Sequence, residues 1–220
     1  MRVFTTWKRA AAAAFVAAGT VGAAVAPGMG AFAAGGSKPA STTFSLFPNK
    51  AQLPCLQVPG GPKPTVQAQV NRGNLNDTLQ LSLTNFKPGL AFDLFTVQRS
   101  NQNADGTARV IPNFGLAWYQ SDVQVGATGT ASVKVRTILL DQIFGFDPDV
   151  ALSPTNTFHL GFWFNNPADA APCGFTGVTP FNGEHTAGPL AFITRPNAVT
   201  DLGPLCTDPN TSTTPATCNP

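Results

Sequence analysis

Thr78-Leu79-Gln80-Leu81-Ser82-Leu83-Thr84 is the stretch that decides the fold, because leucine alternates in it with hydroxyl and amide residues. Successive side chains of a β-strand point to opposite faces of the sheet. A strand over residues 78–84 would therefore place three leucines on one face and polar groups on the other. The pattern predicts a strand with one apolar face.

Further segments along the chain have a similar arrangement of apolar residues. They are Phe44–Phe47, Val66–Val70, Phe92–Val97, Leu116–Trp118, Ser132–Thr137, Phe158–Phe164 and Leu190–Phe192. Turn signals rich in Gly, Asn, Asp or Pro separate several of them, at residues 71–74, 87–89, 104–106 and 127–129. This spacing predicts eight or nine strands in one domain.

Composition supports the same fold class. Gly supplies 21 and Pro 20 of the 220 residues, and this abundance disfavours helices. The 17 phenylalanines lie mostly beyond residue 33 and can fill the space between two sheets. We therefore expect an all-β protein, a two-sheet antiparallel β-sandwich over residues 42–206.

One corner motif resembles a known family. The segment Leu83-Thr84-Asn85-Phe86-Lys87-Pro88-Gly89-Leu90-Ala91-Phe92-Asp93-Leu94 is similar to the corner of fibronectin type III and other immunoglobulin-like sandwiches. In that family a hydrophobic-x-Pro-Gly-x-x-Tyr corner joins the two sheets, and the tyrosine hydroxyl bonds back to the loop. Here Phe92 replaces the tyrosine, so the ring can pack but that hydrogen bond cannot form. The resemblance implies an immunoglobulin-like sandwich and implies little about activity.

Residues 1–33 have the three parts of a cleavable secretory signal peptide. A basic start is followed by an alanine-rich apolar run over residues 10–25, a Pro27-Gly28 break and an Ala31-Phe32-Ala33 cleavage site. The alternative is a retained membrane anchor, which the weak hydrophobicity of alanine and the Pro-Gly break disfavour. We therefore expect a secreted, extracellular, monomeric protein, with a flexible linker at 34–41 and a Thr/Pro-rich tail at 207–220.

The charge balance excludes two classes of partner. Three of the 13 basic residues lie in the leader, so ten face 11 acidic residues in the remaining chain. Nucleic acids and anionic membranes require a basic stripe, and Lys134 with Arg136 is the one close pair. We expect neither partner after the leader is removed.

The four cysteines are scattered, and none forms a C-x-x-C pair of the kind that binds zinc. An even number in an exported chain predicts two disulfides, with three connectivities open among Cys55, Cys173, Cys206 and Cys218. A local loop between Cys206 and Cys218 would leave Cys55 to pair with Cys173.

Sugar binding is the ligand hypothesis that the aromatic residues favour. Trp118, Tyr119 and Trp163 are the available stacking platforms, with Asn165 and Asn166 as neighbouring hydrogen-bonding groups. Trp118 and Tyr119 should point to opposite faces of a strand. Trp163 lies opposite the apolar face of its strand, which makes it the better candidate for an exposed platform; the alternative is that a second layer or a loop covers it.

The two histidines allow an alternative. His159 shares the second face of the 158–164 strand with Trp163, whereas His185 follows Glu184 in a loop. If these three residues met, they could bind a ligand, hold a divalent metal or serve a hydrolase.

Acidic residues indicate two candidate calcium sites. Asp141, Asp147 and Asp149 offer hard oxygen ligands within one loop. The segment Asn101-Gln102-Asn103-Ala104-Asp105-Gly106 resembles the opening of a calcium loop but lacks the leading acid, and Pro112 occupies the place of the closing glutamate. A solvated loop and an Asp-Gly turn are the competing interpretations. Apart from calcium, we expect no cofactor.

No G-x-S-x-G elbow is present, and Glu184 is the one glutamate available for glycosidase chemistry. The sequence therefore predicts a non-enzymatic binding or cell-surface module, with polysaccharide or a cell-envelope component as its partner.

Overall fold

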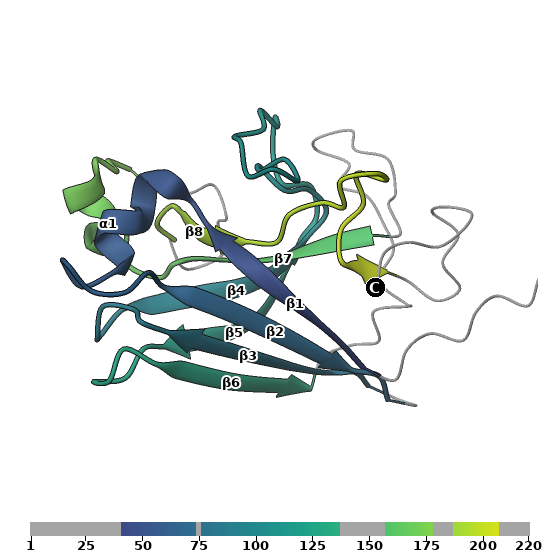
Figure 1. The fold of residues 1–220 in the computed structure, drawn as a ribbon, viewed down its shortest axis with the longest axis horizontal. Helices are drawn as coiled ribbons and strands as arrows, with labels where there is room; N and C mark the ends of the chain where they lie inside the picture. Colours follow the sequence, from purple (N-terminus) through teal and green to yellow (C-terminus); the bar gives the residue numbers. More distant parts are fainter. Residues whose placement is uncertain (1–40, 74–75, 137–156, 178–186, 207–220) are drawn as a thin grey trace, which may run out of the picture. The chain divides into compact units, whose positions relative to one another are not determined.

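The computed structural model describes residues 41–73, 76–136, 157–177 and 187–206 (Figure 1). This part of the chain is mostly β-structure. Its strands are β1 (Ser41–Pro48), β2 (Thr65–Asn71), β3 (Thr78–Thr84), β4 (Ala91–Val97), β5 (Ala117–Gln124), β6 (Ala131–Arg136), β7 (Thr157–Phe164), β8 (Leu190–Ile193) and β9 (Leu205–Cys206). Its short helical segments are η1 (Lys50–Gln52), α1 (Leu53–Leu56) and η4 (Pro167–Cys173). Within these residues no helix has the length and apolarity needed to cross a membrane.

Eight strands form one continuous sheet in the order β5-β4-β7-β8-β1-β2-β3-β6, and β9 adds to β7. All of these pairings are antiparallel. β1 joins the two halves of the sheet, because its residues 41–46 pair with β2 whereas Phe47 and Pro48 pair with β8. The sheet curls until its end strands, β5 and β6, contact each other, so it is nearly closed into a barrel. The predicted antiparallel all-β class is confirmed.

Alternation along β2 and β3 places the apolar residues inside. In the register of the two strands, Leu81 lies opposite Ala68, Leu83 opposite Val66 and Leu79 opposite Val70, and all six side chains are buried. Their polar neighbours in sequence face outward. The prediction drawn from the Leu79-Leu81-Leu83 pattern is confirmed.

Phenylalanine rings from the other half of the sheet, and one from the corner between β3 and β4, meet this aliphatic layer. The rings belong to Phe86, Phe92, Phe162, Phe164 and Phe192, all fully buried. Phe162 stacks on Phe192 with centroids 5.4 Å apart, and Phe92 lies 4.8 Å from Phe162. Burying one such side chain contributes roughly 1.5–3 kcal/mol, so this cluster supplies much of the driving force for folding.

The corner between β3 and β4 carries the chain from one half of the sheet to the other. Asn85 and Gly89 adopt positive φ angles of 64° and 84°, which permit the tight change of direction. Phe86 and Phe92 then meet edge to face, with centroids 5.7 Å apart. Phe92 therefore closes the corner by apolar packing alone.

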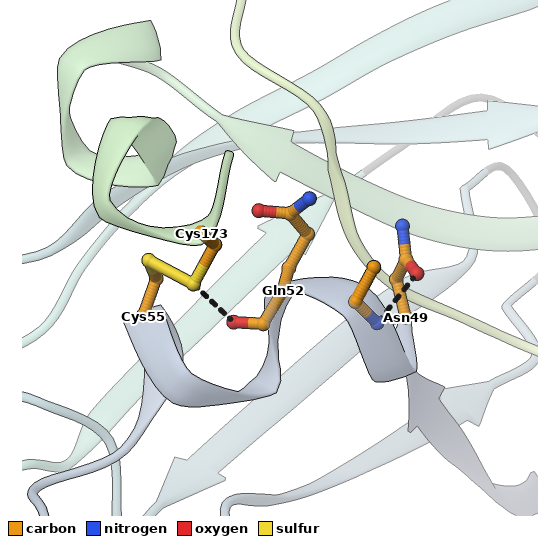
Figure 2. Close-up of a disulfide and its surroundings, with 5 residues drawn as sticks. Asn49, Gln52, Cys55 and Cys173 are labelled. Carbon is orange, nitrogen blue, oxygen red and sulfur yellow. Dashed lines mark hydrogen bonds between the residues drawn. A yellow bond between two sulfur atoms is a disulfide. The ribbon is translucent and has the colours of Figure 1, made fainter. Parts of the chain in front are cut away.

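A disulfide between Cys55 and Cys173 links α1 to η4, with Cα atoms 6.0 Å apart (Figure 2). The two residues are separated by 118 positions in the sequence. Beside the bond, Cys173 Sγ lies 3.8 Å from the carbonyl oxygen of Gln52, and Asn49 caps the preceding turn by accepting from Ala51 N. The predicted Cys55–Cys173 pair is confirmed. The side chain of Cys206 and all of Cys218 lie outside the described residues.

Candidate functional site

Trp163 is fully buried, so of the two interpretations left open by the sequence the covered one holds, and Trp163 is not an exposed stacking platform. Its ring meets the edges of Phe95 and Phe114, with centroid separations of 5.5 and 5.1 Å. It also lies over Gly161, where an added Cβ would be 3.2 Å from Trp163 Cζ3. Trp163 thus belongs to a second hydrophobic cluster on the outer face of β7, together with Val97, Leu190 and Ile193.

The segment between β4 and β5 covers this outer face, and buried polar groups hold it there. Ser100 donates through Oγ to the carbonyl oxygen of Thr194 at 2.8 Å, and Gln102 donates through Nε2 to that of Pro48 at 3.0 Å. Gln98 accepts from Leu116 N at 2.7 Å. Because these contacts reach β8 and β1, the segment is fastened across the sheet, and this is why Trp163 has no access to solvent.

His159 lies on the same covered face. Its side chain is 4% exposed, and its Nδ1 is 2.9 Å from Thr194 Oγ1. Burial lowers the pKa of His159 to about 4, so the ring is neutral at pH 7. A neutral, covered imidazole that contacts Thr194 is a packing group. Glu184 and His185, its predicted partners, lie outside the described residues.

A β-bulge in β5 changes which side chains share its outer face. Asp122 pairs with Asp93 of β4 and Tyr119 pairs with Phe95, so β5 has one residue more than β4 between these two pairs. The extra residue is Gln120, whose Nε2 donates to Thr96 Oγ1 at 2.8 Å. In a regular strand, residues three apart point to opposite faces; the bulge brings Tyr119 and Asp122 to the same one.

Tyr119 presents the exposed aromatic ring of this face, with 54% of its surface accessible. Phe95 supports the ring edge to face at a centroid distance of 5.7 Å, and the hydroxyl donates to Asp122 Oδ1 at 2.7 Å. Burial of the phenol against its neighbours, the hydrogen bond to Asp122 and the charges of Asp122 and Asp93 raise the pKa of Tyr119 to about 12. The phenol therefore stays protonated, and its ring is held in one orientation.

Asn165 and Asp93 extend this polar surface from β4 to the end of β7. The exposed Asn165 donates through Nδ2 to Asp93 Oδ1 at 2.9 Å, and the Asp93 side chain is 6% exposed. Asp93 also pairs in register with Asp122 on one side and with Trp163 on the other. We call Tyr119, Asp122, Asp93 and Asn165 the Tyr119 cluster. It combines an aromatic face with carboxylate oxygens and an amide, the groups that bind a hydroxylated ligand.

Of the predicted stacking platforms, Tyr119 is therefore exposed to solvent and Trp163 is covered. The prediction that Trp118 and Tyr119 point to opposite faces is confirmed, since Trp118 packs edge-on against Phe158 of the core at 5.7 Å. Asp122 and Asp93 were missed as site residues. The sequence does not indicate that these aspartates lie beside Tyr119 and Asn165. The bulge in β5 brings Asp122 to Tyr119, and the pairing of β4 with β7 brings Asp93 to Asn165.

The two calcium candidates have different outcomes. Asp141, Asp147 and Asp149 lie outside the described residues. In the Asn101–Gly106 segment, Asp105 Oδ1 accepts from the backbone and hydroxyl groups of Thr107 at 2.9 and 2.7 Å, as in an Asp-Gly turn. Across the described ranges, no three His, Cys, Asp or Glu side chains are grouped as a metal site.

Comparison of the chain with protein-family models, with curated proteins and with solved structures finds no match in any of the three.

Proposed function

We propose that this protein is an exported, non-enzymatic module that binds polysaccharide through the Tyr119 cluster. The observation that carries the proposal is the exposed ring of Tyr119, supported from behind by Phe95 and tethered by Asp122. A ring that is already ordered loses little conformational entropy when a sugar stacks on it. Asp122 and Asn165 then lie beside it as hydrogen-bonding groups for sugar hydroxyls.

Extracellular function is part of the same proposal. It is supported by the features of residues 1–33, which match a signal peptide, and by the disulfide between Cys55 and Cys173, since such bonds persist in oxidising compartments. A protein that works outside the cell meets polysaccharides as structural material of cell surfaces and matrices.

We further propose that the fold is an immunoglobulin-like sandwich. The order β2-β3-β6 on one side and β4-β7-β8 on the other follows the A-B-E and C-F-G arrangement of that class. In this assignment, the corner at Phe86–Phe92 joins β3, which corresponds to strand B, to β4, which corresponds to strand C. In this assignment β1 is an added strand that also pairs with β8.

The proposal is tested by retention of the protein on insoluble polysaccharides. Replacing Tyr119 by Ala removes the stacking surface, and we expect retention to fall by about tenfold or more, the equivalent of roughly 1.4 kcal/mol. Tyr119→Phe keeps the ring face and should retain most of the binding. Val199→Ala is the matched control, because Val199 is a 92% exposed apolar residue outside the cluster. Equal retention of the wild type and Tyr119→Ala on every polymer would contradict the proposal.

A further inference from the structure

The outer face of the half-sheet β1-β2-β3-β6 has an unusual composition. Over β2, β3 and the part of β1 that pairs with β2 (residues 41–46), its outward residues are hydroxyl or amide residues, and the end strand β6 adds Lys134 and Arg136. We call these outward residues the polar face. Those of β1 as far as Ser45, and those of β2 and β3, are all Ser, Thr, Gln or Asn, and none of them is a carboxylate. Phe47, the next outward residue of β1, belongs to the part of the strand that pairs with β8 and lies against the Arg195 guanidinium, outside this face.

Strand pairing arranges these groups in rows. One row crosses the four strands through Thr43, Gln69, Gln80 and Lys134. The next row, two residues along each strand, runs through Ser41, Asn71, Thr78 and Arg136. Neighbouring strands lie about 4.8 Å apart, so each row spans about 14 Å and ends at a cation. The result is an ordered array of hydrogen-bonding groups with a positive border.

Most of this hydrogen-bonding capacity is not used within the protein. Gln69 donates to Asn71 at 3.3 Å, and the hydroxyls of Thr65 and Thr84 lie 2.6 Å apart. Within the described part of the chain, the side chains of Gln67, Gln80 and Lys134 form no hydrogen bond to another residue. These amide and ammonium groups can therefore bind a partner without first breaking an internal contact.

From this arrangement we propose that the polar face binds an acidic polysaccharide, a polymer that carries both hydroxyl and carboxylate groups. The hydroxyl and amide rows of β2 and β3 match the sugar hydroxyls, and Lys134 and Arg136 match the carboxylates. Among the described residues, no outward side chain of this face is Asp or Glu, so none of the side chains of the face itself repels an anion. This inference goes beyond the Tyr119 cluster, since it depends on different residues on a different part of the sheet.

The test measures the dissociation constant of the full chain for polygalacturonate by isothermal calorimetry at low salt. Replacing Lys134 and Arg136 together by Gln should weaken binding by about tenfold. The control Lys50→Gln with Arg99→Gln removes the same charge away from the face and should leave binding unchanged. The proposal is overturned if the Lys134/Arg136 variant binds as tightly as the wild type. Self-association of that variant would then show that the two cations serve to prevent the end strand β6 from pairing with another copy of the chain.

Gln80 allows a second test, in which a positive or a negative charge is introduced at the same position and the two changes should affect binding in opposite directions. Gln80→Lys adds a cation in the row that contains Lys134 and should strengthen binding by about threefold. Gln80→Glu should weaken it by a similar factor, because the new carboxylate repels the polymer and pairs with Lys134. Both substitutions lie on an exposed strand position and leave the core intact. Equal effects of the two substitutions would overturn the proposal.

Three further probes, polyglutamate, dextran and DNA, separate this site from simpler explanations. Polyglutamate carries carboxylates without sugar hydroxyls, and dextran carries hydroxyls without charge; both should bind more weakly than polygalacturonate. Equal binding of polyglutamate or of DNA would overturn the proposal, because it would show attraction of any polyanion. Tyr119→Ala should leave polygalacturonate binding at the polar face intact, so the failure of either proposal can be recognised without the other.

Discussion

Tyr119 and Asp122 stand three residues apart on β5, yet the tyrosine hydroxyl donates a 2.7 Å hydrogen bond to the aspartate. The single extra residue at Gln120 makes this possible by turning both side chains to the outer face. The site therefore depends on a local irregularity of the strand, and its electrostatics can be measured directly.

Tyr119 is the one tyrosine in the sequence, so phenolate absorbance reports this residue alone. Its pKa is raised to about 12 by burial, by the hydrogen bond to Asp122 and by nearby negative charge. Asp122→Asn removes one charge and weakens the hydrogen bond, so the pKa should fall toward its ordinary value near 10. Absorbance at pH 10.5 should accordingly show more phenolate in the variant than in the wild type. Asp169→Asn, which alters a carboxylate on η4, should match the wild type; equal phenolate in all three proteins would contradict the proposed coupling.

His159 should make the protein sensitive to mild acid. Burial lowers its pKa to about 4, while the unfolded chain binds a proton near pH 6.5, so stability is lost as the pH falls through this window. The expected loss between pH 7 and pH 4 is about 3 kcal/mol from this residue. Arg109 and Asp201, which form an ion pair near it, act on the ring with opposite signs.

His159→Asn keeps a polar group within reach of Thr194 Oγ1 and removes the titration. Urea unfolding at pH 7 and at pH 4 should show a smaller loss of stability in the variant than in the wild type. Carboxylates contribute to acid sensitivity equally in both proteins, so the difference isolates His159. Identical losses in the two proteins would contradict the prediction, because they would show that His159 binds its proton at the same pH in the native and the unfolded state.

Gly161→Ala should destabilise the second hydrophobic cluster. The new Cβ would lie 3.2 Å from Trp163 Cζ3, from Ile193 Cγ1 and from the carbonyl oxygen of Phe192, and overpacking of this kind costs roughly 1–3 kcal/mol. A lower midpoint of thermal unfolding and a changed near-ultraviolet circular dichroism of the tryptophans would check it. Gly126→Ala is the control, because its Cβ would meet one atom at an ordinary 3.5 Å. Equal stability of both variants would mean that Trp163 is loosely packed.

Removing the disulfide should cost about 4–5 kcal/mol, because the Cys55–Cys173 bond closes a long loop and restricts the unfolded chain. The double substitution Cys55→Ala/Cys173→Ala should therefore shift the urea midpoint strongly downward. Reduced wild-type protein should approach the midpoint of the variant. A variant as stable as the oxidised wild type would show that α1 and η4 are held together by packing alone.

The sequence by itself determined the all-β character of the domain and, in strands such as β3, which side chains face the core. Alternation at Leu79, Leu81 and Leu83 is a local property with the period of a strand, so it specifies which side chains face inward without knowledge of the partner strand. The sequence left three connectivities open for the four cysteines, and the bond between Cys55 and Cys173 is observed.

Tertiary structure decided the site. The sequence left open whether the outer face of β7 is exposed or covered, and it is buried because the segment containing Ser100 and Phe114 folds over Trp163 from a distant part of the chain. The bulge at Gln120 selects Tyr119 and Asp122, and the rows of the polar face follow from the pairing of β2, β3 and β6. Period and composition are encoded locally, whereas coverage, register and bulges depend on contacts between segments far apart in sequence, and only the folded chain brings these together.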